Sequence, residues 1–361
     1  MRILDRYILK EFLKYFLGAI VTLLVIIIVA DIFELMDVIF TNKVPILTAS
    51  GYFVYQIPLW ITQVSPVACL IGVLFSLGQI VKNNELTAMK ASGMHLYRIV
   101  APLIIFALFI SFFFILINET VVPYTTSKAQ RYRQEGIYLR PPDSKVTREN
   151  ITLYGSNRQI YRIDGFNGKN NSMHGIFIDT FSKDSILKST LYAKRALWKH
   201  GQWLFSEGVI RKFDKTGKNE ISVEKFYEKS LFTGEIPGDF AKSERKPSEM
   251  NYRELKNYIK KLEDNGFKAH RAKVDLHMKL SFPFANFIIL ILGIPFALFG
   301  GHTKKALGVG IAIVVSFTYW GLMNIGHALG SNGKLTPLVA AWIVNILFLT
   351  FAGVLFLKSN K

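Results

Sequence analysis

The chain has 361 residues, of which 50% are hydrophobic, and carries a formal net charge of +18. This charge suits anionic lipid better than nucleic acid, because no nucleic-acid recognition motif accompanies it. The single cysteine, Cys69, excludes an intrachain disulfide framework. The sequence also lacks a glycine-rich loop ending in Gly-Lys-Ser or Gly-Lys-Thr, so ATP-driven work requires another subunit.

Six apolar runs flank a polar block, three on each side, and each run is close to the roughly 20 residues that a membrane-spanning helix needs. The runs lie at about residues 15–39, 52–80, 99–118, 280–299, 307–329 and 337–357. We therefore predict an α+β membrane protein with six transmembrane helices and a polar domain of short strands inserted between helices 3 and 4.

The first run follows several charged residues between 5 and 14 and precedes no small-x-small cleavage site, which predicts a retained helix and not a signal peptide. Near its end, Asp31, Glu34 and Asp37 share one helical face because they are spaced by three. Three interpretations stay open: solvated acids at the interface, ion pairs with a basic partner subunit, or a site for a divalent cation or proton.

The second run contains Ala68, Gly72 and Ser76, a series of small residues that permits close approach of another helix. The loop that follows, residues 82–98, is too long for a tight turn and too polar to be buried in lipid. Its apolar residues predict a short amphipathic helix over 83–96, ending near Gly93. Such a helix could dock in a groove of a soluble partner or lie among lipid headgroups.

Three basic residues, Lys128, Arg131 and Arg133, follow the third run. Arginine binds phosphate through paired N–H donors, so these side chains are candidate contacts for a phosphorylated lipid headgroup. The alternative is that they are solvated residues at the base of a soluble domain, since long domains are exempt from the charge rule that orients short loops.

The polar block alternates with a period of two from residue 151 to 227, and turn signals separate its segments, which predicts a small sandwich, jellyroll or open barrel. After Pro247, Tyr252, Leu255, Ile259 and Leu262 recur at helical spacing. We expect a connecting helix that stops at residues 265–266. In the fifth run, Asn324 and His327 are either a polar gate element or polar groups satisfied at an interface.

Lysine and arginine gather in short loops on one side of the predicted membrane, at residues 2–14, 82–98, 304–305 and 358–361. The opposite side has only Lys43 and Lys334, so both termini are predicted to be cytoplasmic and the polar block to be outside. The expected segments are 1–122 with transmembrane helices 1–3, 123–246 with the external domain, 247–278 with an amphipathic linker helix, and 279–361 with transmembrane helices 4–6.

Four segments together resemble the LptF/LptG family of lipopolysaccharide export permeases. They are Ile-Leu-Asp-Arg-Tyr-Ile at 3–8, Asn-Glu-Leu-Thr-Ala-Met-Lys-Ala-Ser-Gly at 84–93, Tyr-Ile-Lys-Lys-Leu at 258–262 and Lys-Leu-Ser-Phe-Pro at 279–283. The resemblance covers essentially the whole chain, and its opening is closer to the LptG branch. It implies a bacterial inner-membrane permease with a periplasmic β-jellyroll domain.

The resemblance also implies partners: a second LptF/LptG-type permease, an LptB-type ATPase dimer that holds ATP and Mg, an LptC-type single-span protein and an LptA-like periplasmic bridge. Lipopolysaccharide would be the substrate, and this chain would itself hold no cofactor. The ATPase-coupling residues would be Glu85, Leu86, Met89, Ala91, Ser92, Gly93 and Met94.

Within the same resemblance, the first and fifth spans would line lateral gates, and Arg133 would contact substrate, with Lys128 and Arg131 beside it. Family members often present a basic residue near the end of the first span, so the acidic trio at 31–37 departs from the pattern. This departure puts any substrate contact from the first span in doubt.

Two other classes are weighed against a permease. A membrane-embedded lipid-modifying enzyme would need converging catalytic groups, but the seven histidines are scattered, with neither a His-Glu-x-x-His pairing nor a nucleophile elbow. A receptor or scaffold would need only one span to anchor the polar block. A permease for another anionic lipid is the alternative nearest to the main hypothesis.

Overall fold

The computed structural model describes residues 3–139, 147–182, 186–231, 233–241, 247–299 and 305–359. The chain divides into two compact units. We call the first, Met1–Tyr138 with Pro247–Leu255 and His270–Lys361, the helical unit. We call the second, Leu139–Lys246 with Lys256–Ala269, the sheet unit.

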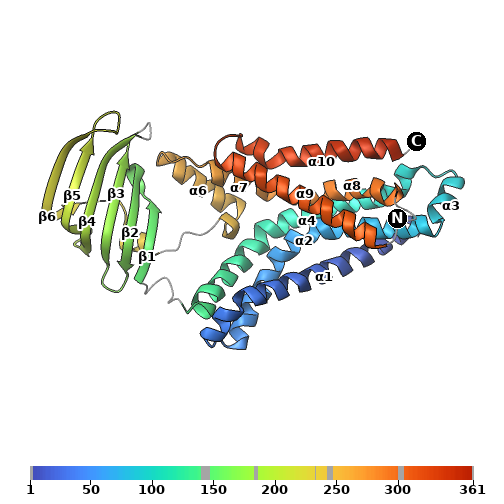
Figure 1. Ribbon diagram of the computed structural model, residues 1–361, viewed down its shortest axis with the longest axis horizontal. Coiled ribbons are helices and arrows are strands. Elements are labelled where there is room, and N and C mark those ends of the chain that lie inside the picture. The colour runs from blue at the N-terminus through green and yellow to red at the C-terminus, as the bar shows by residue number, and fades with distance from the viewer. Residues whose placement is uncertain are drawn as a thin grey trace. The chain divides into compact units, whose positions relative to one another are not determined.

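The helical unit contains the apolar helices, which Figure 1 labels in chain order. Its elements are α1 (Ile3–Thr41), α2 (Ile46–Lys82), α3 (Glu85–Ala91), α4 (Leu96–Arg131), η1 (Tyr132–Ile137), η4 (Pro247–Glu249), the first turn of α6 (Tyr252–Asp264), α7 (His270–Ser281), α8 (Ala285–Phe299), α9 (Lys305–Ser331) and α10 (Pro337–Ser359). Within the described residues, five helices are long and apolar enough to cross a membrane, or six when the bent pair α7–α8 counts as one span.

The third apolar helix is longer than its apolar run predicts. We expected a span over 99–118 and a boundary after residue 122, but α4 reaches Arg131, and η1 adds a π-helical segment to Ile137 inside the same unit. Hydropathy marks where a helix faces lipid, and it does not mark where the backbone hydrogen bonds end. Lys128 and Arg131 therefore lie on a helix, and Arg133 lies on η1.

The linker and the fourth span also differ from expectation. The expected linker over 247–278 consists of η4, α6 and part of α7, and α6 ends just before Gly266, whose φ is +79°. The span expected at 280–299 is broken, because α7 and α8 meet at 54°. Pro283 stands at this break and has no N–H to continue the helix.

Buried amides satisfy the backbone at the break between α7 and α8. The Asn345 amide of α10 donates to the Ser281 carbonyl at 2.9 Å, and the Asn286 amide donates to the Pro283 carbonyl at 3.0 Å. The Tyr319 hydroxyl of α9 donates to the other side of the Asn345 amide at 2.5 Å. A backbone interrupted at membrane depth needs such partners, because lipid offers no hydrogen bonds.

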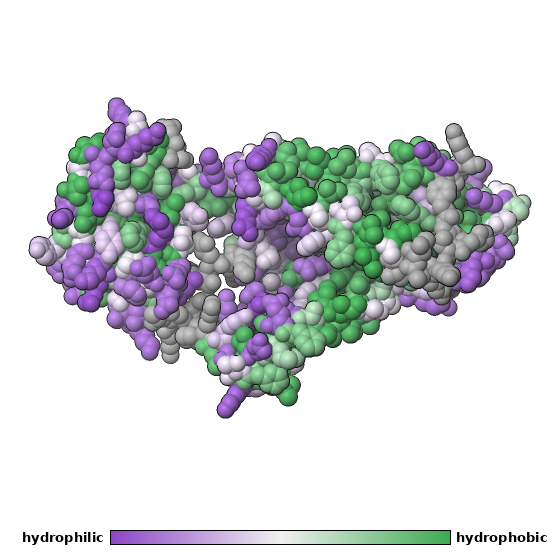
Figure 2. Space-filling view, in the orientation of Figure 1, coloured by the Kyte–Doolittle hydropathy of each residue, from purple (hydrophilic) through white to green (hydrophobic). Residues whose placement is uncertain are grey.

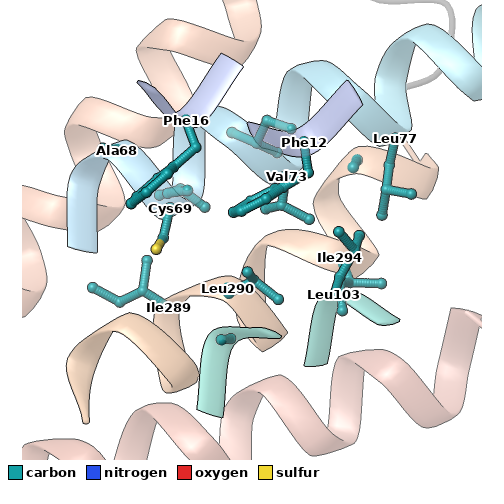
Figure 3. Packing of buried hydrophobic residues seen from close by; sticks show 14 of the residues in the cluster. Phe12, Phe16, Ala68, Cys69, Val73, Leu77, Leu103, Ile289, Leu290 and Ile294 are labelled. Atoms are coloured by element: carbon teal, nitrogen blue, oxygen red, sulfur yellow. The ribbon is translucent and has the colours of Figure 1, made fainter. Parts of the chain in front are cut away.

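The core of the helical unit lies between α1, α2, α4 and α8. Phe12 and Phe16 of α1 stack at 5.6 Å and lie beside Ala68, Cys69 and Val73 of α2 in Figure 3. Gly72 allows this approach, since an added Cβ would lie 2.9 Å from the Phe12 ring. The series of small residues on α2 therefore has the packing role predicted for it.

The surface of the helical unit is largely apolar. Figure 2 shows apolar side chains gathered over α1 and α10 on the face in view. Along the middle of α1, Val21, Val25, Ile26 and Phe33 are exposed, and Phe33 retains 67% of its accessible surface. An apolar surface of this extent indicates lipid or a partner chain in place of water.

The sheet unit holds six antiparallel strands in sequential order, seen as consecutive arrows in Figure 1. They are β1 (Thr147–Tyr154), β2 (Gln159–Asn167), β3 (Ser172–Phe181), β4 (Leu187–Lys199), β5 (Gln202–Phe213) and β6 (Glu220–Leu231), with η3 (Ser156–Arg158) after β1 and α5 (Pro237–Ala241) after β6. A jellyroll needs two sheets joined by Greek-key crossovers. The described strands form a meander, so the predicted strands are present but the jellyroll topology is not confirmed.

The segment after β6 covers the apolar face of the sheet. Phe240 of α5 contacts the rings of Tyr161 and Trp203 at 5.4 and 5.7 Å. The Trp203 indole donates to the Glu235 carbonyl at 3.0 Å, and the Tyr161 hydroxyl donates to the Glu235 carboxylate at 2.8 Å. Burial, reinforced by that carboxylate, raises the pKa of Tyr161 well above its ordinary value.

Candidate functional site

The short helix α3 is braced on the core of the helical unit. Leu86 is buried, while Met89 and Met94 pack partly buried against the same core. The helix ends where the Ser92 hydroxyl donates to the Met89 carbonyl at 2.8 Å, and Gly93 then adopts a φ of +82°. The helix is shorter than the expected range of 83–96, because the residues on either side of it form turns.

The outward surface of α3 carries short side chains, apart from Lys90. Thr87, Ala88, Lys90 and Ala91 are exposed there, and the exposed residues Ser92 and Gly93 follow directly. Small side chains on an element that the core holds firmly make a surface on which another protein can pack closely. This surface contains the predicted coupling residues Ala91, Ser92 and Gly93, whereas Leu86, Met89 and Met94 anchor the helix from below.

Glu85, at the start of α3, is engaged within its own chain. Its Oε2 accepts a hydrogen bond from the Tyr7 hydroxyl at 2.9 Å, and its Oε1 accepts one from the Asn83 amide at 3.0 Å. Close by in the sequence, Arg98 grips Asp5 with both terminal nitrogens, at 2.7 and 3.0 Å. Asp5 and Tyr7 belong to the opening at 3–8 that carries the family resemblance, but their partners could not be read from the sequence.

A second polar group lies at the other end of the helical unit. We call the end that carries α3 the α3 end and the end that carries η1 the η1 end. At the η1 end, Arg133 pairs with Glu34 of α1 at 3.4 Å, and its guanidinium lies 5.9 Å from the centre of the Tyr138 ring. Asp31 is within electrostatic reach of both Tyr52 and Arg133. Basic and acidic candidates that we considered separately therefore meet in one cluster.

Lys128 and Arg131 have partners of their own. The Lys128 ammonium lies 5.6 Å from the Tyr55 ring and 5.2 Å from the Tyr124 ring, a cation–π arrangement. Arg131 pairs with Glu135 one turn later at 3.3 Å. The three basic residues thus do not converge on one point, and Arg133 is the one that reaches α1.

The three residues of the acidic trio at 31–37 also lie in different surroundings. Glu34 is paired inside the chain, Asp31 faces Tyr52 and Arg133, and Asp37 is exposed. Among the described residues, no group of three His, Cys, Asp or Glu side chains is placed to hold a metal ion. The basic partner for Glu34 that we sought in another subunit is present in this chain.

Asn324 and His327 of α9 have separate partners. The Asn324 amide donates to the Trp320 carbonyl of its own helix at 2.8 Å. His327 contacts Asp275 of α7 at 2.7 Å. The His327 contact matches a polar group satisfied where two helices meet, whereas Asn324 is exposed and bonded within α9. A role of either residue in a gate stays a prediction.

A cavity of about 340 Å³ lies near the first turn of α6, and sequence reasoning did not anticipate it. Glu119 of α4 accepts a hydrogen bond from the Tyr252 backbone N–H at 2.7 Å and so closes one wall. The lining residues come from α4, α6 and α7: Ile115, Asn118, Glu119, Tyr252, Arg253, Lys279 and Leu280.

A sequence profile for "Lipopolysaccharide export system permease LptF/LptG" matches residues 6–358. The chain belongs to this family. The "Lipopolysaccharide export system permease protein LptG" of Escherichia coli (strain K12) is 24% identical over 324 residues, which cover 88% of this chain and 87% of that protein. The protein of the same name from Haemophilus influenzae (strain ATCC 51907 / DSM 11121 / KW20 / Rd) is 21% identical over 357 residues and 96% of each chain.

Both relatives carry the name LptG, in agreement with the branch that the opening at 3–8 resembles. As a member of the LptF/LptG family, the chain is a transporter subunit and not a catalytic enzyme. The family and the apolar helices together support a multi-pass protein of the inner membrane. The alternative of a membrane-embedded lipid-modifying enzyme is therefore set aside.

Proposed function

We propose that this chain is one permease half of an ATP-driven exporter that extracts lipopolysaccharide from the inner membrane. An LptB-type ATPase dimer would hold ATP and Mg and dock on the exposed face of α3. The observation that carries this proposal is α3 itself, a short helix with small exposed residues outside and Leu86, Met89 and Met94 packed inside. A push on such a helix reaches the core directly.

The direction of transport rests on loop charges. Lysine and arginine at 2–14, 82–98, 304–305 and 358–361 favour a cytoplasmic α3 end. The η1 end and the sheet unit would then be periplasmic, with an LptC-type single-span protein beside the helices.

The exposed middle of α1 supports a lipid path between two permease halves. Val21, Val25, Ile26 and Phe33 would face acyl chains across a cavity shared with the second LptF/LptG-type permease. Each buried methylene is worth about 0.8 kcal/mol, and a lipid with several chains has dozens of them. Emptying such a cavity therefore requires the free energy of ATP hydrolysis.

At the η1 end, Arg133, with Lys128 and Arg131 nearby, would contact the phosphates of the lipid headgroup. The sheet unit would receive the acyl chains and pass them to an LptA-like periplasmic bridge. The last strand, β6, supports a contact between the sheet unit and that bridge. Its residues Ile221, Val223 and Tyr227 are exposed, and the strand lies at the edge of the sheet. Exposed edge strands are suited to pairing with strands of another chain.

The docking proposal is tested by Ala88→Arg, which places a long charged side chain on the outward face of α3. We expect the copurified ATPase, identified by mass spectrometry, to be lost together with lipopolysaccharide-stimulated ATP hydrolysis. Lys358→Glu, near the end of α10, is the matched surface control and should leave both unchanged. If the Ala88→Arg complex kept a bound and stimulated ATPase, the docking site would lie elsewhere.

The alternative substrate, another anionic lipid, is examined with the same complex. We expect lipopolysaccharide to stimulate ATP hydrolysis in proteoliposomes, and phosphatidylglycerol alone to leave it at its basal rate. Equal stimulation by the two lipids would favour a permease of broader specificity.

A further inference from the structure

Two contacts join the first turns of α1 to the elements around the proposed docking surface: Asp5 with Arg98 of α4, and Tyr7 with Glu85 of α3. We infer that these four residues form a transmission clamp, through which movement of α3 is passed to α1. The inference rests on the proposed function, and it gives the four side chains a positioning role in transport.

The Asp5–Arg98 pair has the geometry of a fixed connection. The terminal nitrogen Nη1 of Arg98 lies 2.7 Å from Oδ1 of Asp5, Nη2 lies 3.0 Å from Oδ2, and the Asp5 side chain is only 13% exposed. Paired N–H···O bonds set the relative orientation of two groups as well as their distance. The start of α1 is thereby held to the start of α4, directly after the loop that contains α3.

The Tyr7–Glu85 contact makes the second connection, and it reaches α3 itself. Both carboxylate oxygens of Glu85 are used inside the chain, one by Tyr7 and the other by Asn83. Glu85 therefore serves the path from α3 to α1, whereas the exposed residues Thr87, Ala88 and 90–93 supply the docking surface. This division refines the coupling segment, in which Glu85 and those residues had one role.

The path continues along α1 without a gap. Ile8, directly after Tyr7, and Phe12, about one turn farther on, are fully buried, and Phe12 and Phe16 rest against α2 at Gly72. Farther along, the apolar middle of α1 is exposed. A helix that is held at its start and exposed on the outer side of its middle can pass a displacement at its start on to that exposed side.

Tyr7→Phe tests the clamp, because it removes the hydroxyl and keeps the ring. In proteoliposomes that contain the whole complex, we expect the ATPase to stay bound and active. Lipopolysaccharide delivered to an added acceptor per ATP hydrolysed should fall about fivefold, the scale of one ordinary hydrogen bond within a protein. Tyr97→Phe is the matched control, since Tyr97 lies at the same end and packs its ring on Phe356.

A charge exchange tests the Asp5–Arg98 pair independently of any general loss of stability. Asp5→Arg and Arg98→Asp should each lower the yield of lipid per ATP, and the two together should restore most of it. Rescue of this kind requires the pairing itself and not either side chain alone.

Four outcomes are decisive. A Tyr7→Phe complex with a wild-type yield would overturn the clamp, and so would a double exchange that rescues nothing. Loss of the bound ATPase in Tyr7→Phe would also overturn it, because the contact would then only support α3. The wild-type complex separates failure of the proposed function from failure of the clamp. If the proposed function were wrong, the wild-type complex itself would hydrolyse ATP without delivering lipopolysaccharide.

Discussion

The two ends of α1 carry ion pairs of the same chemistry and opposite character. At the α3 end, Asp5 and Arg98 share two contacts, and the carboxylate is largely buried. At the η1 end, Glu34 and Arg133 share one contact at 3.4 Å, and the Glu34 side chain is 68% exposed. Exposed pairs contribute about 0–1 kcal/mol, whereas groups withdrawn from water depend strongly on their partners.

This difference indicates which connection can exchange its partner. A phosphate that approaches the η1 end can replace the Glu34 carboxylate on Arg133 at little cost, because both are oxygen anions in contact with solvent. The Asp5 carboxylate is only 13% exposed and holds Arg98 through two contacts, so displacing it costs more. The same helix is thus fixed where the ATPase is proposed to act and adjustable where the substrate is proposed to bind.

The largest expected effect comes from breaking the packing that holds the α3 end. Gly72→Val would push a side chain into Phe12 and Phe16, which have no free volume on that side. We expect a destabilisation of about 1–3 kcal/mol, the usual range for overpacking, measured as a lower Tm of the purified complex. Gly78→Val is the control on the same helix, since a Cβ at Gly78 meets nothing within 4 Å. Equal losses in the two variants would contradict the close approach at Gly72.

A smaller effect on stability, with a clear effect on binding, is expected at the η1 end. Glu34→Gln should change the free energy of unfolding by at most about 1 kcal/mol, because the pair is exposed. It should also free Arg133 and raise lipopolysaccharide capture by a photo-crosslinking residue in place of Tyr138, whose ring lies beside that guanidinium.

Two further variants sharpen this comparison. Arg133→Gln should lower the capture at position 138, and Glu135→Gln, which releases Arg131 instead, should leave it unchanged. If Arg133→Gln left the capture of lipopolysaccharide at position 138 unchanged, Arg133 would be a solvated residue at the base of a soluble domain.

The smallest expected effect is a change with pH in the stability that one surface carboxylate contributes. Asp214, in the turn between β5 and β6, is half-buried, and its carboxylate accepts hydrogen bonds from Thr216, Lys218 and Asn219. These bonds, with the Thr216 hydroxyl contributing most, lower the pKa of Asp214 to about 2. Its stabilising contribution is therefore complete above its ordinary pKa near 4 and is lost as the pH falls through 2.

The measurement compares the Tm of the wild-type chain with that of Asp214→Ala between pH 5 and pH 2.5. The wild-type advantage should be constant down to about pH 4 and shrink below it. An advantage that does not depend on pH would mean that the turn is held by its backbone alone.

Local patterns predicted the elements well, since helical spacing at 84–94 and alternation at 151–227 reflect contacts within each element. These patterns do not show which other helix or strand each element packs against. A period of two identifies a strand, but any strand of similar length can lie beside it, so a jellyroll and a meander fit the same alternation.

The candidate site shows the same limit: local spacing was predictable, and contacts between distant residues were not. The spacing of Asp31, Glu34 and Asp37 indicates one helical face, but it gives no sign of Arg133, which lies 99 residues from Glu34 in the sequence. Tyr7 and Glu85 are 78 residues apart. Opposite charge or a hydroxyl makes such pairs compatible, but only the packing of α1 against α2 and α4 brings them together.

The break between α7 and α8 has a consequence for the bilayer itself. With 15 residues, α8 rises about 22 Å, whereas the hydrocarbon layer is about 30 Å thick. α7 must therefore complete the crossing, and the two helices together count as one broken span. The amides of Asn286 and Asn345 hold the bend between them, so lipid beside this span meets a column that changes direction inside the bilayer and keeps that shape.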